Sequence, residues 1–424
     1  MEEFPETLSD FSVSYRDESL FMEDVSLERI VDAVGTPAYV YSQAHIQAQY
    51  KKLAEAIKAV DYRVHYAVKA NSNLALLKLL GNLGAGYDIV SGGELSRVLS
   101  AQGDPGSVIF SGVGKATHEL DLALKAGIEC FNVESAGELD RLAERAALLS
   151  VVAPVAIRFN PNVDAKTHPY ISTGLQENKF GVLKDQALAL YRRAAESEHL
   201  RVYGIACHIG SQIAEPTPLI RALEEMLSLR RELAQQGIEI DHLDLGGGFG
   251  VRYRDEPEFD VGLWGREVAR LLNGTGLRIS IEPGRFLTAN AGILLSRVEY
   301  LKEAVEDAKS FAVVDAAMND LIRPALYGAW HEVVPVCNDL QGDRLPWDIV
   351  GPICESGDFI AKQRTLTLKQ GKLLAILSSG AYGATLASNY NTRGRAPEVL
   401  VHKDNWRLVR RRENLQDQLI TELP

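Results

Sequence analysis

Two patterns of apolar and polar positions alternate along the chain from residue 62 onward. Short apolar runs, rich in β-branched residues, are separated by longer stretches with the spacing of an amphipathic helix. Near-continuous apolar strands joined by helices indicate parallel pairing, because both faces of such a sheet are covered. The predicted strands are 62–70, 86–91, 107–112, 129–135, 154–161, 201–211, 242–248 and 278–285. The predicted helices include 43–59, 73–83, 92–101, 117–126, 136–148 and 218–236.

This α/β region fits a closed (β/α)8 barrel of the TIM type better than a doubly wound open sheet, although an open sheet can also hold eight strands. After about residue 286 the pattern changes to strand-like runs with turn residues between them, which predicts an all-β, antiparallel C-terminal domain. Those runs are 310–315, 333–336, 349–354 and 365–377, and Gln370-Gly371 divides the last as a hairpin turn would. We expect a barrel at 37–285 and a β-sandwich or β-barrel at 286–424, completed by residues 1–36, whose runs 11–15 and 19–22 could add a strand.

Composition narrows the class of protein. A chain of 424 residues exceeds what one core usually supports, and its net charge of -12 argues against a nucleic-acid or anionic-membrane partner. The cysteines, at 130, 207, 337 and 354, show no metal-type spacing, which favours a reducing compartment. The first ten residues lack the order of a signal peptide, and no apolar run is long enough to span a bilayer. We expect a cytoplasmic protein that binds no metal, and we interpret Arg410–Arg412 as a solvated face.

Unusual polar residues fall at the ends of the predicted strands, where (β/α)8 barrels place their chemistry. Lys69 ends the first strand, and an enclosed lysine amine is suited to a Schiff base. Taken alone, however, a lysine at a strand end is more often one whose amine reaches solvent. Asp88 lies at the end of the second strand, before Ser91, which we interpret as a helix N-cap. His208 precedes Gly210-Ser211, a turn able to bind an anion, although a lone histidine is more often structural.

Two further motifs follow the seventh and eighth strands, where barrel phosphate sites often lie. Gly246-Gly247-Gly248-Phe249-Gly250 lets backbone N–H groups approach a phosphate, and Glu282-Pro283-Gly284-Arg285 follows it. A dinucleotide site is excluded, because the glycine spacing is wrong and the eighth strand offers no ribose carboxylate. A lysine, a histidine and two phosphate-type loops on one rim indicate a single site.

Taken in order, these residues resemble the group IV pyridoxal-phosphate-dependent decarboxylases, which have an alanine-racemase-like fold of a barrel plus a β domain. The resemblance runs from about residue 25 to about residue 400. The segments that carry it are YAVKAN at 66–71, SGGEL at 91–95, CHIGSQ at 207–212, GGGFG at 246–250, EPGR at 282–285, RPALYG at 323–328, GPICESGD at 351–358 and GAYG at 380–383.

The resemblance implies that Lys69 binds pyridoxal 5'-phosphate covalently and that Glu282 bonds its pyridine nitrogen. A negative charge there keeps the nitrogen protonated and makes the ring an electron sink. Because racemases of this fold carry a basic residue at that place, Glu282 favours decarboxylation. His208 would stack on the ring and Asp88 would lie near the cofactor. The implied phosphate contacts are Gly210, Ser211, Gly247, Gly248, Gly284, Arg285 and Tyr382.

The resemblance also implies that Cys354 and Glu355 enter the active site of a partner subunit, with Cys354 as the proton donor. Without the surrounding motif, the favoured interpretation of Cys354 would be a buried, inert thiol. A head-to-tail homodimer with shared sites is therefore expected.

The substrate is inferred from the charges available for its distal end. Arg285, Arg323 and Tyr327 can bind a carboxylate, and Glu355 can take an ammonium group, with Tyr382 also near the substrate. Arg323 could instead form a structural ion pair. A tail with both charges matches meso-2,6-diaminopimelate, whose decarboxylation gives L-lysine and CO2 in the last step of lysine biosynthesis. Residues 168–174 and 178–181 also resemble the segments found in decarboxylases that act on diaminopimelate. The alternatives are a related enzyme acting on carboxynorspermidine, ornithine or arginine, and a non-catalytic decarboxylase-like regulator.

Overall fold

A computed structural model describes residues 8–165, 179–304, 309–339 and 341–422, and the chain divides into two units. Unit 1 contains Met1–Ala48, Arg252–Glu256 and Leu287–Pro424, and unit 2 contains Gln49–Val251 and Pro257–Phe286. Residues 37–48 thus group with unit 1, whereas the sequence suggested that the barrel begins at 37. Within the described ranges, no helix combines the length and apolar character needed to cross a membrane.

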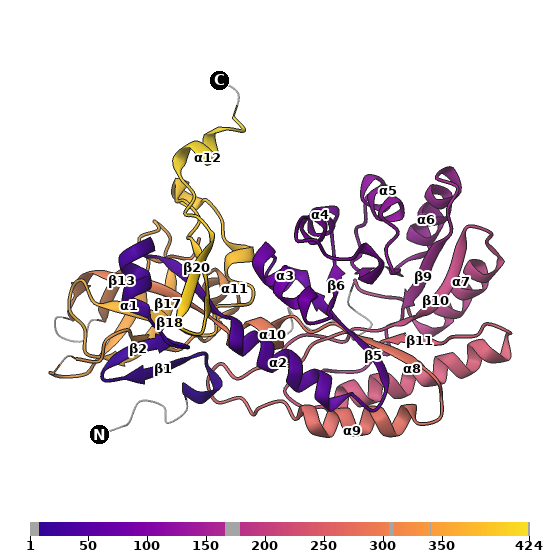
Figure 1. The fold of residues 1–424 in the computed structure, drawn as a ribbon, viewed down its shortest axis with the longest axis horizontal. Coiled ribbons are helices and arrows are strands. Elements are labelled where there is room, and N and C mark those ends of the chain that lie inside the picture. The colour runs from indigo at the N-terminus through magenta and orange to yellow at the C-terminus, as the bar shows by residue number, and fades with distance from the viewer. Residues whose placement is uncertain (1–7, 166–178, 305–308, 340, 423–424) are drawn as a thin grey trace. The chain divides into compact units, whose positions relative to one another are not determined.

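Unit 2 is a closed barrel of parallel strands, as predicted (Figure 1). Each observed strand overlaps its predicted run but ends sooner, because the last residues leave the sheet and form the loops of the rim. In barrel order the strands are β10 (Leu200–Ala206), β11 (His242–Asp244), β12 (Arg278–Ile281), β5 (Asp61–Ala67), β6 (Gly86–Ile89), β7 (Val108–Phe110), β8 (Cys130–Val133) and β9 (Ala153–Arg158).

Helices follow the barrel strands along the chain, and α7 and α9 among them were not predicted. Side-chain caps set several helix starts: Ser91 accepts a hydrogen bond from the backbone of Glu94 (3.2 Å), so its prediction as an N-cap is confirmed. The helices are α2 (Gln43–Ala56), which begins in unit 1, α3 (Leu74–Asn82), α4 (Gly92–Ser100), α5 (Thr117–Ala126), α6 (Ala136–Leu148), α7 (Lys184–Glu196), α8 (Thr217–Gln235) and α9 (Val261–Leu272).

Unit 1 is built on a large, mostly antiparallel sheet, which confirms the predicted β domain. Its main path runs β17-β16-β14-β13-β4-β19-β20, and β18 joins β15 to β13. Two pairings, β14 with β16 and β4 with β19, are parallel. The strands are β4 (Ala38–Ser42), β13 (Gly292–Lys302), β14 (Ser310–Val314), β15 (Val333–Pro335), β16 (Leu345–Val350), β17 (Phe359–Leu366), β18 (Leu373–Ile376), β19 (Glu398–His402) and β20 (Asn405–Arg410). The short helices α11 (Arg323–Tyr327) and α12 (Leu415–Leu419) belong to this unit, whereas α10 (Arg285–Thr288) begins in unit 2 and ends in unit 1.

Two predictions about this sheet were wrong. Residues 367–372 do turn the chain, but β17 pairs with β16 and β18 pairs with β13 and β15, so no hairpin forms at Gln370-Gly371. The N-terminal runs do not add a strand to the large sheet; β4, which was not predicted, does so between β13 and β19. All five residues of β4 are buried, so its sequence lacks the alternation of a half-exposed strand.

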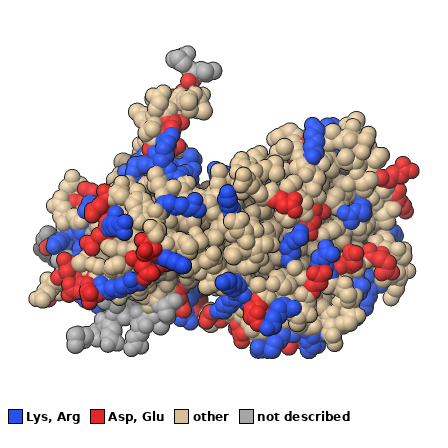
Figure 2. Space-filling model, in the orientation of Figure 1, with Lys and Arg blue, Asp and Glu red and all other residues tan. Residues whose placement is uncertain are grey.

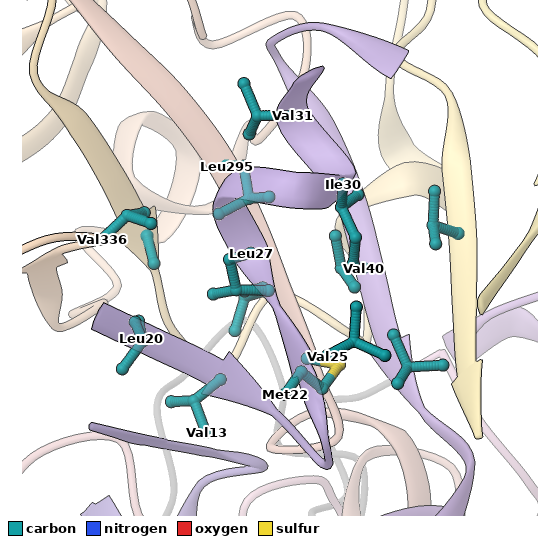
Figure 3. Close-up of a cluster of buried hydrophobic side chains, with 14 of the residues drawn as sticks. Val13, Leu20, Met22, Val25, Leu27, Ile30, Val31, Val40, Leu295 and Val336 are labelled. Atoms are coloured by element: carbon teal, nitrogen blue, oxygen red, sulfur yellow. The ribbon is translucent and has the colours of Figure 1, made fainter. Parts of the chain in front are cut away.

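The N-terminal runs instead form a separate sheet of β1 (Val13–Arg16), β2 (Ser19–Met22) and β3 (Val25–Ser26), followed by α1 (Leu27–Val34). Figure 3 shows their apolar side chains gathered with Val40, Leu295 and Val336 of the large sheet and its loops. Leu20, Met22, Leu27 and Ile30 are fully buried there. This segment therefore covers part of the hydrophobic core of unit 1.

Basic and acidic side chains are mixed over the face drawn in Figure 2. The run Arg410–Arg412 is held by contacts within unit 1. Arg410 pairs with Glu398 (2.9 Å), Arg411 pairs with Asp417, and Arg412 donates to the carbonyl oxygen of Pro37 (2.9 Å). The run is thus engaged locally and does not form a free basic patch.

Candidate active site

A cavity of about 200 Å3 lies within the barrel of unit 2. Lys69, predicted at the end of a strand, belongs to a short 3-10 turn, η2 (Val68–Ala70), directly after β5. Its Nζ lies 2.5 Å from Oδ2 of Asp88, whose side chain is fully buried. The lining residues are Lys69, Val90, Ser111, Gly112, Asn132, Arg158, Phe180, Ala206, Cys207, His208, Asp244 and Glu282.

His208 lies beside Lys69 in the cavity and is neutral. Burial lowers its pKa well below the ordinary value, and the charges of Arg158 and Lys69 add to this shift. The backbone N–H of Gly247 donates to Nδ1 of His208 (3.2 Å), so Nδ1 carries no proton and the ring proton lies on Nε2. Nδ1 also lies 3.9 Å from a carboxylate oxygen of Glu282, but a neutral ring makes no ion pair there.

The glycine-rich turn is held by close backbone packing. At Gly248, φ is 96° and a Cβ atom would collide with the carbonyl oxygen of Gly210, while a Cβ on Gly247 would collide with that of Glu282. Gln212 clamps the turn by donating to the carbonyl oxygen of Val251 (2.6 Å) and accepting from its N–H (3.2 Å). These glycines therefore serve the fold itself, besides leaving room for a ligand.

The second predicted phosphate loop lies next to this turn. Arg285 donates to Oγ of Ser211 through Nη2 (3.2 Å), which joins the loops after β12 and β10. A Cβ on Gly284 would lie 2.9 Å from Cβ of Ala70. The predicted cofactor residues of the barrel thus come together on one rim.

Two buried carboxyl groups meet in the cavity. Burial raises the pKa of Glu282 well above the ordinary value, and the charges of Asp244 and Asp88 raise it further, while Lys69 lowers it. Asp244 hydrogen-bonds to Glu282 and was missed from the sequence. Nearby, burial raises the pKa of Glu94 to about 7.

Arg158 is a further lining residue that the sequence did not reveal. Its Nη1 donates to Oε1 of Glu134 (2.9 Å), and its guanidinium lies 4.9 Å from the ring centre of Phe180. The predicted segments 168–174 and 178–181 are described only from residue 179 onward, so their earlier residues lie outside the described structure. The only signal for Arg158 was its place at the end of the fifth strand.

The remaining predicted residues belong to unit 1. Arg323 is 7% exposed; it donates to Nε2 of His331 (2.9 Å) and lies 4.6 Å from the ring centre of Tyr253. Tyr327, in α11 with Arg323, is half-buried. The structure therefore shows Arg323 in a structural hydrogen bond and a cation–π contact.

Cys354, Glu355 and Tyr382 lie on loops of unit 1. Cys354 is exposed, which excludes the interpretation as a buried, inert thiol within this chain. The hydroxyl of Tyr390 donates to Oε1 of Glu355 (2.9 Å), and Asn391 accepts from the backbone N–H of Cys354 (3.4 Å). Tyr382 is half-buried at φ 56°, in the left-handed region.

Comparison with known proteins assigns the family. The family described as "Pyridoxal-dependent decarboxylase, pyridoxal binding domain" matches residues 43–289. The chain is 57% identical over 406 residues to the diaminopimelate decarboxylase of Pseudomonas aeruginosa, covering 95% of this chain and 97% of the relative. The chain belongs to the diaminopimelate decarboxylase family.

Solved structures of diaminopimelate decarboxylases agree with the fold. The enzyme from Helicobacter pylori, complexed with L-lysine, is 40% identical with a TM-score of 0.89, covering 93% of this chain and 98% of that one. The enzyme from M. jannaschii, in co-complex with L-lysine, is 36% identical with a TM-score of 0.92 and 99% coverage of both chains.

Diaminopimelate decarboxylases are pyridoxal-phosphate enzymes, and the described cavity fits that group. The buried Oδ1 of Asp88 has no hydrogen-bond partner among the described residues, beside an amine that can bind an aldehyde. The glycine turn, Ser211 and Arg285 offer donors for a phosphate. The expectation of pyridoxal phosphate is therefore confirmed, while the role of each residue stays a prediction.

Proposed function

We propose that this chain catalyses decarboxylation of meso-2,6-diaminopimelate to L-lysine and CO2. The observation that carries the proposal is the cavity that joins Lys69, His208 and Glu282 in a chain of this family. A full-length relative at 57% identity supports the same substrate.

Pyridoxal phosphate, when bound, supplies an electron sink for the pair of electrons left at the α-carbon as CO2 departs. Lys69 would hold its aldehyde, with Asp88 accepting from the lysine amine. Glu282 would hold a proton at the ring nitrogen. His208, being neutral, can pack on the ring face without opposing the positive charge of that nitrogen. Gly210, Ser211, Gly247, Gly248, Gly284 and Arg285 would bind the phosphate, with Tyr382 from the β domain.

The proton that replaces CO2 would come from Cys354 of a second copy of this chain. Its exposed thiol and the exposed side chain of Glu355 support this proposal, because both lie at the surface of this chain, where another subunit can contact them. Glu355 would bind the distal ammonium group, and Arg285, Arg323 and Tyr327 would bind the distal carboxylate. To bind that carboxylate, Arg323 would have to give up its hydrogen bond to His331 or use its other N–H groups while keeping it.

We further propose a cytoplasmic homodimer in which residues 37–285 bind the cofactor and residues 286–424, completed by 1–36, supply the groups for the partner site. The separated cysteines and the negative net charge support this location.

Product analysis tests the proposed reaction. The full chain, loaded with pyridoxal phosphate, is incubated separately with meso-diaminopimelate, ornithine, arginine and carboxynorspermidine, and amine products and CO2 are measured. We expect L-lysine from the first and at least about tenfold slower turnover of the others. Comparable rates on ornithine would refute the substrate, and no CO2 from any of them would favour a regulator. In the wild type, borohydride reduction should attach the cofactor covalently to the peptide that contains Lys69, and Lys69→Ala should abolish this attachment.

Mixing two inactive variants tests the shared site. Lys69→Ala and Cys354→Ala homodimers, mixed under conditions that exchange subunits, should regain activity through hybrid dimers with one intact site. Mass spectrometry of differently labelled chains monitors the exchange. No recovery despite confirmed exchange would contradict a site built from two subunits.

A further inference from the structure

Asp244 and Glu282 lie against each other in the cavity, although only Glu282 is expected to face the cofactor. Asp244 ends β11, and Glu282 directly follows the neighbouring parallel strand β12. Their side chains hydrogen-bond to each other and are buried, with exposed fractions of 1% and 6%. Two carboxylates offer only acceptors, so one proton must lie between them.

The position of Asp244 is set by donors on both of its oxygens. The backbone N–H of Gly246 donates to Oδ1 (3.0 Å), and Nδ2 of Asn132 donates to Oδ2 (2.8 Å). Asn132 also donates to Oγ of Ser111 (3.1 Å), whose hydroxyl donates weakly to Oε1 of Glu282 (3.4 Å). The two acids and these two neutral side chains form a closed hydrogen-bonded ring.

The surroundings of the pair contain both signs of charge. Burial and the negative charges of Asp244 and Asp88 favour a protonated Glu282, and Lys69 opposes them. A neutral carboxyl is a weaker acceptor than a carboxylate for the N–H of a protonated ring. The titratable and charged groups that face the pair from neighbouring elements are Lys69, Asp88, Arg158, His208, His65, Cys130 and Cys207.

We propose that Asp244 is a positioning residue that forms a dyad with Glu282, holding one proton and presenting one negative charge to the ring nitrogen of the cofactor. This inference rests on the proposed function, because it requires that Glu282 faces that nitrogen. When the ring N–H arrives, the O–H bond of Glu282 breaks and an O–H bond forms on Asp244. The dyad keeps one proton, and Glu282 becomes the charged acceptor.

Infrared spectroscopy of the cofactor-free full chain tests the dyad directly. At pH 8 the wild type should show the C=O band of a protonated carboxyl group, and both Asp244→Asn and Glu282→Gln should lose it, because each removes one half of the shared-proton pair. Asp320→Asn, which removes a buried carboxyl from unit 1, is the matched control and should keep the band. A band that persists in Asp244→Asn would overturn the dyad, since Glu282 would then hold its proton through burial alone.

A second measurement uses the cofactor-loaded chain. In the wild type, loss of the dyad proton at high pH adds a second negative charge that keeps the ring nitrogen protonated. Asp244→Asn cannot form this second negative charge. The midpoint pH of the absorbance change that reports loss of the nitrogen proton should therefore be lower than in the wild type by about one pH unit or more. An unchanged midpoint would show that Asp244 does not act on the cofactor.

Asn132→Ser covers the case in which Asp244→Asn fails to fold. Loss of the amide donor makes Asp244 a stronger base, so the carboxyl band should persist to higher pH than in the wild type; an unchanged titration would refute the dyad. The cofactor-free measurements also separate the two proposals. If both dyad variants lose the band but no cofactor is trapped on Lys69, the dyad stands and the proposed function fails.

Discussion

Glu134 offers the sharpest stability prediction, because its side chain accepts three hydrogen bonds at the rim of the barrel. Oε1 accepts from Nη1 of Arg158 (2.9 Å) and from the N–H of Gly112 (3.0 Å), and Oε2 accepts from the N–H of Gly181 (3.0 Å). The side chain of Glu134 is 1% exposed and that of Arg158 is 10% exposed. Glu134→Ala therefore leaves a buried guanidinium without its carboxylate.

The expected loss follows from that burial. Removing one partner of a buried ion pair typically costs about 3–5 kcal/mol. The two stranded N–H groups would each cost about 1–3 kcal/mol alone, but these effects overlap, so we expect a total near 3–5 kcal/mol. Glu134→Gln keeps an acceptor and should lose less. Asp140→Ala, which breaks an exposed pair with Arg193, should cost about 0–1 kcal/mol.

Urea unfolding of the full chain, followed by circular dichroism, measures these differences. The same samples give the affinity for pyridoxal phosphate, which should weaken in Glu134→Ala because Arg158 lines the cavity. A loss below about 1 kcal/mol, equal to that of Asp140→Ala, would refute the argument that the Glu134 network is held out of water.

Three further outcomes are expected. Burial raises the pKa of Glu129, but hydrogen bonds from His65 and Tyr203 and nearby charge outweigh it and lower the pKa from 4.5 to about 2. The stability that the Glu129 carboxylate contributes is therefore present above pH 4.5 and is lost as the pH falls toward 2. Glu129→Gln should make the free energy of unfolding, measured by urea titration at each pH, depend less on pH over this acidic range. The buried ring of Phe249 packs edge-on against two aromatic rings, with ring centres 4.9–5.3 Å apart. Phe249→Ala should lower the free energy of unfolding by about 3–5 kcal/mol in the same assay, and Phe249→Leu should lower it distinctly less. Equal losses in the two variants would contradict a packing role. Gly248→Ala should weaken pyridoxal-phosphate binding in a fluorescence titration, because the new methyl group forces the turn away from Gly210, and wild-type affinity would show that the turn adapts.

The barrel could be predicted from sequence because its strands are buried on both faces and carry a continuous apolar signal. The same property hid β4, whose five buried residues precede a helix and resemble its start. The pairing of β18 with β13, more than 70 residues earlier in the chain, is set by tertiary packing, so a local turn such as Gln370-Gly371 could only suggest a hairpin.

The candidate site was predictable where one residue carries its own chemistry and sits at a strand end, as Lys69 and Glu282 do. Asp244 was missed because its importance depends on partners such as Asn132, 112 residues away, which closure of the barrel brings within 2.8 Å. Gln212 was missed for a similar reason, since a glutamine gains its role only from the turn that it clamps.

The small N-terminal sheet has a practical consequence for anyone who shortens the chain. The small sheet covers apolar side chains of the large sheet through Val13, Leu20, Met22 and Val25. Removal of residues 1–26 would therefore expose a hydrophobic patch on the large sheet. Such a protein should associate through that patch during expression, even with every cofactor ligand of the barrel still in place. Tags are therefore better fused ahead of this segment than substituted for it.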